Sequence, residues 1–124
     1  MLLPGQDLNL GNALLLVTSE MEPEHETEIN RWFDEEHVPE RLEVPGFLWA
    51  RRYRVLEGAP TYVNLYGLTD ADVLQSEAYL AVRPPSDRRN RVVRGHVRNT
   101  RSVYTTITKH YPDGYRHDAI RTGQ

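Results

Sequence analysis

The sequence predicts a single α+β domain whose elements follow the order β-α-β-β-α-β. Three observations lead to this prediction. The chain of 124 residues has the length of one domain. Short β-rich segments alternate with segments whose apolar residues recur at helical spacing. Proline and glycine residues separate these segments where turns are required.

The first predicted strand and helix lie in the N-terminal third of the chain. Ala13–Thr18 is a short apolar run with the length of a buried strand. Pro23 suits the first turn of a helix, where a proline needs no amide partner. Pro39 cannot donate a backbone hydrogen bond, and it disfavours helical geometry at Val38. We therefore expect the first helix to end at about Val38.

The remaining elements follow in order after this helix. They are a strand at Phe47–Val55, a strand at Thr61–Leu68, a helix at Ala71–Val82 and a strand at Thr100–Thr108. Strict alternation along the first of these strands places Phe47, Trp49 and Tyr53 on one face. Ser86 is the expected cap of a short polar helix before the last strand.

This order is the split βαβ, or ferredoxin-like, arrangement, with a four-stranded antiparallel sheet and helices on one face. The other face needs a cover, and a second copy of the sheet is the simplest one. A hydrophobic fraction of 39% and a mean hydropathy of -0.64 are low for a small domain that buries its core alone, which also favours a homodimer. We expect an N-terminal arm at residues 1–12, the domain at 13–108 and a C-terminal tail at 109–124.

The composition excludes several classes of protein. There are no cysteines, so disulfides and thiolate chemistry are excluded. No apolar run approaches the length of a membrane span or resembles a signal-peptide core, so we expect a cytoplasmic protein with no membrane partner. The sequence has no glycine-rich phosphate loop, serine–histidine–aspartate arrangement or dinucleotide fingerprint, and we expect no cofactor.

Charge is distributed unevenly along the chain, whose formal net charge is -3. Residues 20–43 hold ten acids and two arginines, whereas residues 83–101 hold seven arginines and one acid. These segments are read either as two solvated faces of opposite sign or, for the arginines, as a nucleic-acid patch. The arginine run lacks interleaved aromatics, so we expect no nucleic-acid partner. The sequence leaves open whether residues 83–101 line a pocket or only the surface.

His37 is the leading candidate for a catalytic group. It lies one turn beyond Phe33, at the edge of the predicted buried face of the first helix. Imidazole titrates near neutrality, and the negative end of the helix dipole favours its charged form. The alternative is a histidine that caps the helix carbonyls. Asp34 is better placed than Glu36 to orient the imidazole, and the alternative for both acids is a solvated helix face.

Aromatic side chains and arginines supply the expected substrate-binding surface, because flat walls with polar handles suit an aromatic or polyketide-like ligand. The expected members are Trp32, Phe33, Trp49, Arg52, Tyr53 and Tyr62. Tyr66, together with Tyr53, is expected to donate a hydrogen bond to a developing oxyanion. Core packing is the alternative for the rings, and ion pairing for the arginine. No metal site is expected, since His25 and His37 are more than three helical turns apart.

The segment around His37 resembles the EthD-like members of the dimeric α+β barrel superfamily. The matching pieces are Trp32-Phe33-Asp34, Glu36-His37-x-Pro39, Val44-Pro45-Gly46-Phe47 and Ala50-Arg51-Arg52-Tyr53. The resemblance implies a dimer whose two sheets close into a barrel, a pocket between sheet and helices, and an acid–base role for His37. The superfamily includes cofactor-free monooxygenases, polyketide cyclases and dehydratases, and lactone isomerases.

The residues and the resemblance together predict a small cofactor-free enzyme. It would move protons on an aromatic, lactone or polyketide-like molecule, as a lyase, an isomerase or a dehydratase or cyclase. A cofactor-free monooxygenase of the same fold is the first alternative. A non-enzymatic dimer that binds a small ligand is the second.

Overall fold

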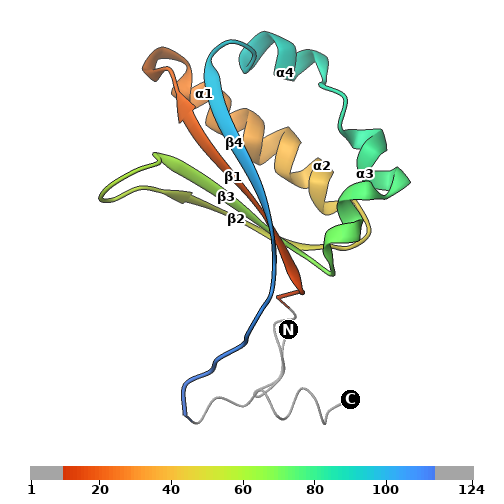
Figure 1. The fold of residues 1–124 in the computed structure, drawn as a ribbon. Helices are drawn as coiled ribbons and strands as arrows, with labels where there is room; N and C mark the ends of the chain where they lie inside the picture. The colour runs from red at the N-terminus through yellow and green to blue at the C-terminus, as the bar shows by residue number, and fades with distance from the viewer. Residues whose placement is uncertain (1–9, 114–124) are drawn as a thin grey trace.

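The computed structural model describes residues 10–113 and confirms the α+β, ferredoxin-like class (Figure 1). The predicted N-terminal arm and C-terminal tail fall mostly on residues 1–9 and 114–124, which lie outside the described residues. One antiparallel sheet has the strand order β2-β3-β1-β4. The strands are β1 (Ala13–Met21), β2 (Phe47–Arg54), β3 (Tyr62–Leu68) and β4 (Val97–Thr105).

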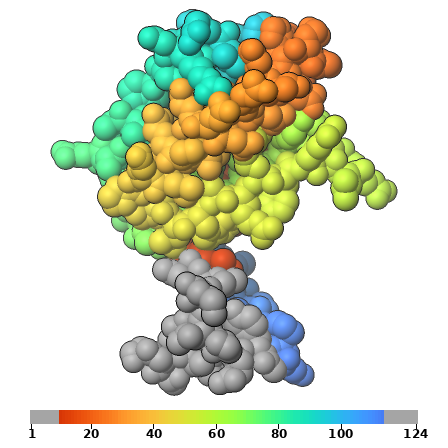
Figure 2. Space-filling model, turned by 180° about the vertical axis from the view of Figure 1, so that it is seen from behind, coloured from red at the N-terminus to blue at the C-terminus, as the bar shows by residue number. Residues whose placement is uncertain are grey.

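All helices of the described residues lie on the same face of this sheet (Figure 1). They are the 3-10 helix η1 (Pro23–His25), α1 (Glu26–Trp32), the π-helical turn η2 (Phe33–His37), α2 (Val38–Leu42), the 3-10 helix η3 (Ala71–Gln75), α3 (Glu77–Val82) and α4 (Asp87–Val92). Figure 2 shows the orange α1 between the blue-green α4 and the yellow-green β2–β3 hairpin. Within the described part of the chain, no helix is long and apolar enough to cross a membrane.

The first helix does not end at Val38, contrary to the prediction. α1 passes into η2, and α2 then carries the chain on to Leu42. Val38 keeps helical angles, with φ -65° and ψ -47°, although Pro39 follows it. Pro39 stands at the start of α2, where its missing amide removes no essential hydrogen bond. The wide π-helical turn absorbs the change of hydrogen-bond register between the two segments.

The second predicted helix is divided at Ser76, which has extended angles of φ -70° and ψ 153°. The Asp70 carboxylate caps η3 by accepting a hydrogen bond from the amide of Asp72 at 2.8 Å. The Ser76 hydroxyl caps α3 by accepting from the amide of Tyr79 at 3.2 Å. Two caps therefore start two short helices where one longer helix is predicted.

β4 starts and ends three residues earlier than predicted, because it follows the full length of β1. The pairing runs from Ala13 opposite Thr105 to Met21 opposite Val97. β1 is also longer than the predicted Ala13–Thr18, since its polar end is held by this pairing.

A β-bulge at Leu48 inverts the faces of β2. Phe47 pairs with Leu68, whereas Trp49 pairs with Gly67. Phe47 consequently packs in the core beneath the helices, and Trp49 lies on the other face. The prediction that Phe47 shares a face with Trp49 and Tyr53 is wrong, because one extra residue reverses the alternation.

The core lies between the sheet and the helices in two clusters. The larger cluster joins the sheet to α3 and consists of Ala13, Leu15, Val44, Phe47, Tyr66, Leu68, Val73 and Tyr79. The smaller cluster joins α1 and η2 to α4 and consists of Ile29, Trp32, Phe33 and Val93. The space that remains between these clusters holds the site described below.

The other face of the sheet carries no helix among the described residues (Figure 1). Leu14 and Leu16 lie half-buried on it, in the middle strand β1. Tyr53 and Tyr104 lie on the outer strands, with 42% and 49% of their surface exposed. This face therefore carries apolar and aromatic side chains that no helix of residues 10–113 covers.

Candidate active site

A cavity of about 300 Å³ lies between the sheet and the helices. Its floor includes Leu15 of β1 and Tyr66 of β3. Trp32, Phe33 and His37 form the wall on the side of α1 and η2. The remaining wall comes from α2, α3, α4 and β4, so every layer of the fold contributes. The volume is at the lower end of the range for small-molecule sites.

His37 is the last residue of the π-helical turn and is partly buried beside two aromatic rings. Its ring centroid lies 4.7 Å from that of Trp32 and 5.5 Å from that of Phe33. Among residues 10–113 the imidazole makes no hydrogen bond, so the carbonyl-capping alternative is not observed. Both ring nitrogens are available to a ligand.

The environment of His37 strongly favours the neutral imidazole. Burial lowers its pKa from 6.5 to about 3, and the positive charges of Arg41, Arg89 and Arg52 add to the effect. The expectation that the helix dipole favours the charged form is wrong. The helix continues through α2, so His37 is not at its negative end, and burial outweighs any effect of the dipole.

Tyr66 presents a buried phenol to the same cavity, with only 1% of the residue exposed. Burial raises its pKa to about 12, so the hydroxyl stays protonated at neutral pH. Its Oη makes no hydrogen bond within the described structure. Asn64 lies near enough to lower the pKa slightly but does not reach hydrogen-bond geometry. An unpaired buried hydroxyl is costly, which leaves a donor available to a ligand.

Glu36 reaches the cavity wall, whereas Asp34 does not. The Glu36 carboxylate accepts hydrogen bonds from Trp32 Nε1 at 2.8 Å and from the Ser86 hydroxyl. The Ser86 hydrogen bond is the main cause of the lowered pKa of Glu36. Predicting Asp34 as the better-placed acid assumed α-helical spacing, and the π-helical turn changes the direction of these side chains.

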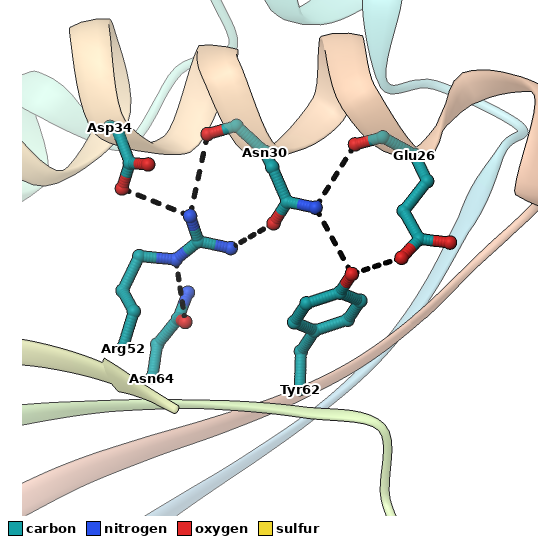
Figure 3. Close-up of polar contacts among 6 residues, drawn as sticks. All are labelled: Glu26, Asn30, Asp34, Arg52, Tyr62 and Asn64. Atoms are coloured by element: carbon teal, nitrogen blue, oxygen red, sulfur yellow. Dashed lines mark hydrogen bonds and ion pairs between the residues drawn. The ribbon is translucent and has the colours of Figure 1, made fainter. Parts of the chain in front are cut away.

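Asp34, Arg52 and Tyr62 belong to a polar network between α1, η2 and the sheet, outside the cavity lining (Figure 3). Arg52 donates to Asp34 Oδ1 at 2.9 Å, to Asn64 Oδ1 at 3.0 Å and to Asn30 Oδ1 at 2.5 Å. It also lies over the Phe33 ring, 4.7 Å from the centroid. Tyr62 donates to the Glu26 carboxylate and accepts from Asn30 Nδ2 at 3.2 Å.

Trp49 and Tyr53 lie on the opposite face of the sheet from His37. Trp49 donates from Nε1 to the Leu10 carbonyl at 3.1 Å and lines a separate cavity of about 740 Å³. Tyr53 is stacked under Arg51, 5.3 Å from the guanidinium carbon to the ring centroid.

Of the nine residues that the sequence proposes as catalytic or substrate-binding, the structure gathers four around the cavity: Trp32, Phe33, His37 and Tyr66. Glu36, the acid weighed beside Asp34, also lines it. Sequence reasoning missed several others that also line it: Arg41, Tyr79, Ser86, Arg89 and Arg101. For Arg89 and Arg101 the available signal was the arginine run at residues 83–101.

One group of possible metal ligands occurs in the described part of the chain: Glu22, His25 and His96. The two rings are stacked 3.6 Å apart at an interplanar angle of 18°. Imidazole lone pairs lie in the ring planes, so nearly parallel rings do not direct both nitrogens at one ion. His96 Nδ1 lies 2.7 Å from Glu22 Oε1, and the cluster links η1 to the start of β4 outside the cavity lining.

The strand order, with the cavity between the sheet and the helices, defines a ferredoxin-like α+β protein with a site of small-molecule size. The chain belongs to the DUF4286 family, described as a domain of unknown function, whose model matches residues 12–112. An EthD family protein is among the solved structures that share the fold, but the family shown for this chain is DUF4286, and its EthD-like resemblance stays a prediction. No curated protein matches the sequence.

Solved structures share the fold at low sequence identity. The heme-degrading protein MhuD of Mycobacterium tuberculosis, with two hemes bound, has a TM-score of 0.56 and 16% identity, covering 80% of this chain and 99% of its own. A Streptomyces coelicolor monooxygenase from the gene ActVA-Orf6, in complex with Nanaomycin D, has a TM-score of 0.60 and 16% identity. The match covers 86% of this chain and 99% of that protein. An EthD family protein of Bacillus halodurans has a TM-score of 0.54 and 14% identity, and the match covers 77% of this chain and 99% of that protein. At these identities the likeness shows the fold alone.

Proposed function

We propose that the protein is a small-molecule enzyme that carries out acid–base chemistry in the cavity between His37 and Tyr66. The observation that supports this proposal is that one cavity holds two unpaired groups of complementary function. Among residues 10–113, the neutral imidazole of His37 has no hydrogen-bond partner, and neither has the buried phenol of Tyr66. An acceptor for a proton and a donor for an oxyanion are the parts that proton transfer next to a carbonyl requires.

The proposed step moves one proton. Neutral His37 takes the proton from the carbon next to a substrate carbonyl, and the bonding electron pair moves onto the carbonyl oxygen. That oxyanion accepts a hydrogen bond from Tyr66, while Trp32 and Phe33 hold the flat part of the substrate. Returning the proton to another carbon gives an isomerisation, and loss of a leaving group gives an elimination.

Proton abstraction can be tested without the natural substrate. Benzoylacetone has an acidic methylene between two carbonyls, and its exchange for deuterium in D₂O is followed by NMR. We expect exchange faster than in buffer, a loss of about a hundredfold in His37→Gln and a similar loss in Tyr66→Phe. Because Tyr66→Phe removes an unpaired buried hydroxyl, its free energy of unfolding should be unchanged or higher.

Tyr53→Phe is the matched control, because Tyr53 lies on the opposite face of the sheet and should leave the exchange rate unchanged. Exchange that is no faster than in buffer, or that survives in His37→Gln with the fold intact, would count against the proposal.

A cofactor-free monooxygenase is the second candidate, since it shares the same first step. The substrate carbanion would transfer electrons to dioxygen and form a hydroperoxide, whose loss of water converts the methylene to a carbonyl. The bound Nanaomycin D in the structurally similar Streptomyces coelicolor monooxygenase supports this candidate. Oxygen uptake that accompanies turnover of benzoylacetone distinguishes it from isomerisation or elimination. Ligand binding with neither exchange nor oxygen uptake would favour a non-enzymatic binding protein.

We also infer that two copies pair through the uncovered face of the sheet. This face carries Leu14 and Leu16 along its middle strand and exposed Tyr53 and Tyr104 on the outer strands. A dimeric ferredoxin-like protein from an uncultured marine organism shares the fold, with a TM-score of 0.57. We expect sedimentation velocity to give the mass of a dimer and Leu16→Glu to give that of a monomer. A monomeric wild-type protein would contradict the inference.

A further inference from the structure

The cavity of the proposed active site carries an excess of positive charge. Four arginines line it, Arg41, Arg83, Arg89 and Arg101, against two carboxylates, Glu36 and Glu40. Glu40 is paired with Arg41, with 3.0 Å between Oε1 and Nη1. Three arginines therefore remain against one carboxylate, and that carboxylate already accepts hydrogen bonds from Trp32 and Ser86.

The arginines of this region differ in whether their guanidinium groups have hydrogen-bond or ion-pair partners. Arg41 donates to the Val82 carbonyl at 3.0 Å in addition to Glu40. Arg88, which precedes Arg89 in the sequence, forms an ion pair with Glu35, with 2.7 Å between Nη2 and Oε1. The Arg89 side chain is partly buried and makes no hydrogen bond or ion pair within residues 10–113. Within the described part of the chain, the one hydrogen bond of the Arg101 side chain is a long one, 3.5 Å to the Tyr79 hydroxyl.

The segment that carries Arg89 is fixed in place as a wall of the cavity. The Ser86 hydroxyl accepts from the Arg89 amide at 3.0 Å and donates to the Glu36 carboxylate of η2. At the other end, Val93 is buried against α1 and η2, with 1% exposed. Both ends of α4 are thus attached to the helix that carries His37, so Arg89 faces the cavity from a fixed backbone.

We propose that the substrate carries a carboxylate and that Arg89 binds it, with Arg101 as a second guanidinium at the cavity. A planar guanidinium offers parallel donors that match the two oxygens of a carboxylate. The inference rests on the proposed function of the cavity and narrows its substrate class to aromatic or polyketide-like acids. It also assigns a role to part of the arginine run of residues 83–101.

A bound carboxylate would also change His37. The charged and titratable groups that line the cavity with His37 or act on its pKa come from every layer of the fold: Glu36 of η2, Glu40 and Arg41 of α2, Arg52 of β2, Tyr66 of β3, Tyr79 of α3, Arg83, Arg89 of α4 and Arg101 of β4. Positive charge from three of these arginines disfavours the imidazolium. An anion on Arg89 offsets part of that charge, so His37 becomes a stronger base when the substrate is bound.

The binding test uses naphthoate and its uncharged amide, naphthamide, which share ring and shape. Tryptophan fluorescence in a Trp49→Phe background reports on Trp32 at the cavity wall. We expect naphthoate to bind at least ten times more tightly than naphthamide, a difference of about 1.4 kcal/mol. Arg89→Gln should abolish this preference, and Arg89→Lys should retain part of it. Arg88→Gln, the adjacent arginine paired with Glu35, should leave it unchanged.

A second readout follows His37 by NMR during the same titration. Naphthoate should raise the pKa of the imidazole in the wild-type protein and not in Arg89→Gln, whereas naphthamide should raise it in neither. Equal binding of the two probes, absence of binding by both, or equal losses in Arg88→Gln and Arg89→Gln would overturn the inference. Selective binding of naphthoate without any deuterium exchange of benzoylacetone would uphold it while counting against the proposed enzyme.

Discussion

Replacing Arg52 with alanine is expected to lower the free energy of unfolding by about 3 kcal/mol. Arg52 satisfies the side-chain oxygens of Asn64 and Asn30 and reaches the Asn30 carbonyl at 3.3 Å (Figure 3). Asn64 is 2% exposed, so its amide oxygen would lose a partner that water does not readily replace. The stacking of the guanidinium on the Phe33 ring would be lost as well.

The Asp34→Ala variant measures the contribution of the ion pair to stability separately from that of the other hydrogen bonds of Arg52. The Asp34 side chain is 65% exposed, so solvent screens its interaction with Arg52, and we expect a loss below about 1 kcal/mol. Urea unfolding of both variants measures the two losses. Equal losses would show that the ion pair, and not the buried amides, accounts for the contribution of Arg52.

The second large effect is a dependence of the free energy of unfolding on pH, which we expect because the pKa of His37 is lowered in the folded protein. Its pKa is about 3 in the folded protein and about 6.5 in the unfolded chain, so only the unfolded chain binds the proton between these values. Stability is therefore fully present above pH 6.5 and falls as the pH drops toward 3. The loss is about 1.4 kcal/mol per pH unit. Between pH 6.5 and 5, the wild-type protein should lose about 2 kcal/mol more than His37→Gln.

His110→Gln, which replaces an exposed histidine, should keep the wild-type pH dependence. NMR titration of the imidazole gives an independent measurement, and the His37 resonance should not titrate above pH 5. A transition near pH 6.5 would show that the imidazole is hydrated in solution, and the neutral base of the proposed mechanism would lose its support.

The sequence by itself determined the order of the elements and their approximate positions. Local signals are sufficient for this, because hydrophobic period, turn residues and caps act over a few neighbouring residues. The cap at Ser86 and the strand at Phe47–Arg54 illustrate the point. The same signals located the Trp32–Phe33–His37 side of the cavity, since one helical face carries all three residues.

Only the tertiary structure decided which side chains meet. A π-helical turn moved Asp34 away from the cavity and brought Glu36 to it, and one bulge moved Trp49 to the other face of the sheet. Each is a change of one residue in hydrogen-bond register, and a change of that size reverses the direction of every side chain that follows in a strand. Arg89 lies at the site because α4 packs on α1 and η2, which are far from it in sequence. Such long-range packing cannot be predicted from a local sequence pattern, because the residues in contact are not neighbours in the chain.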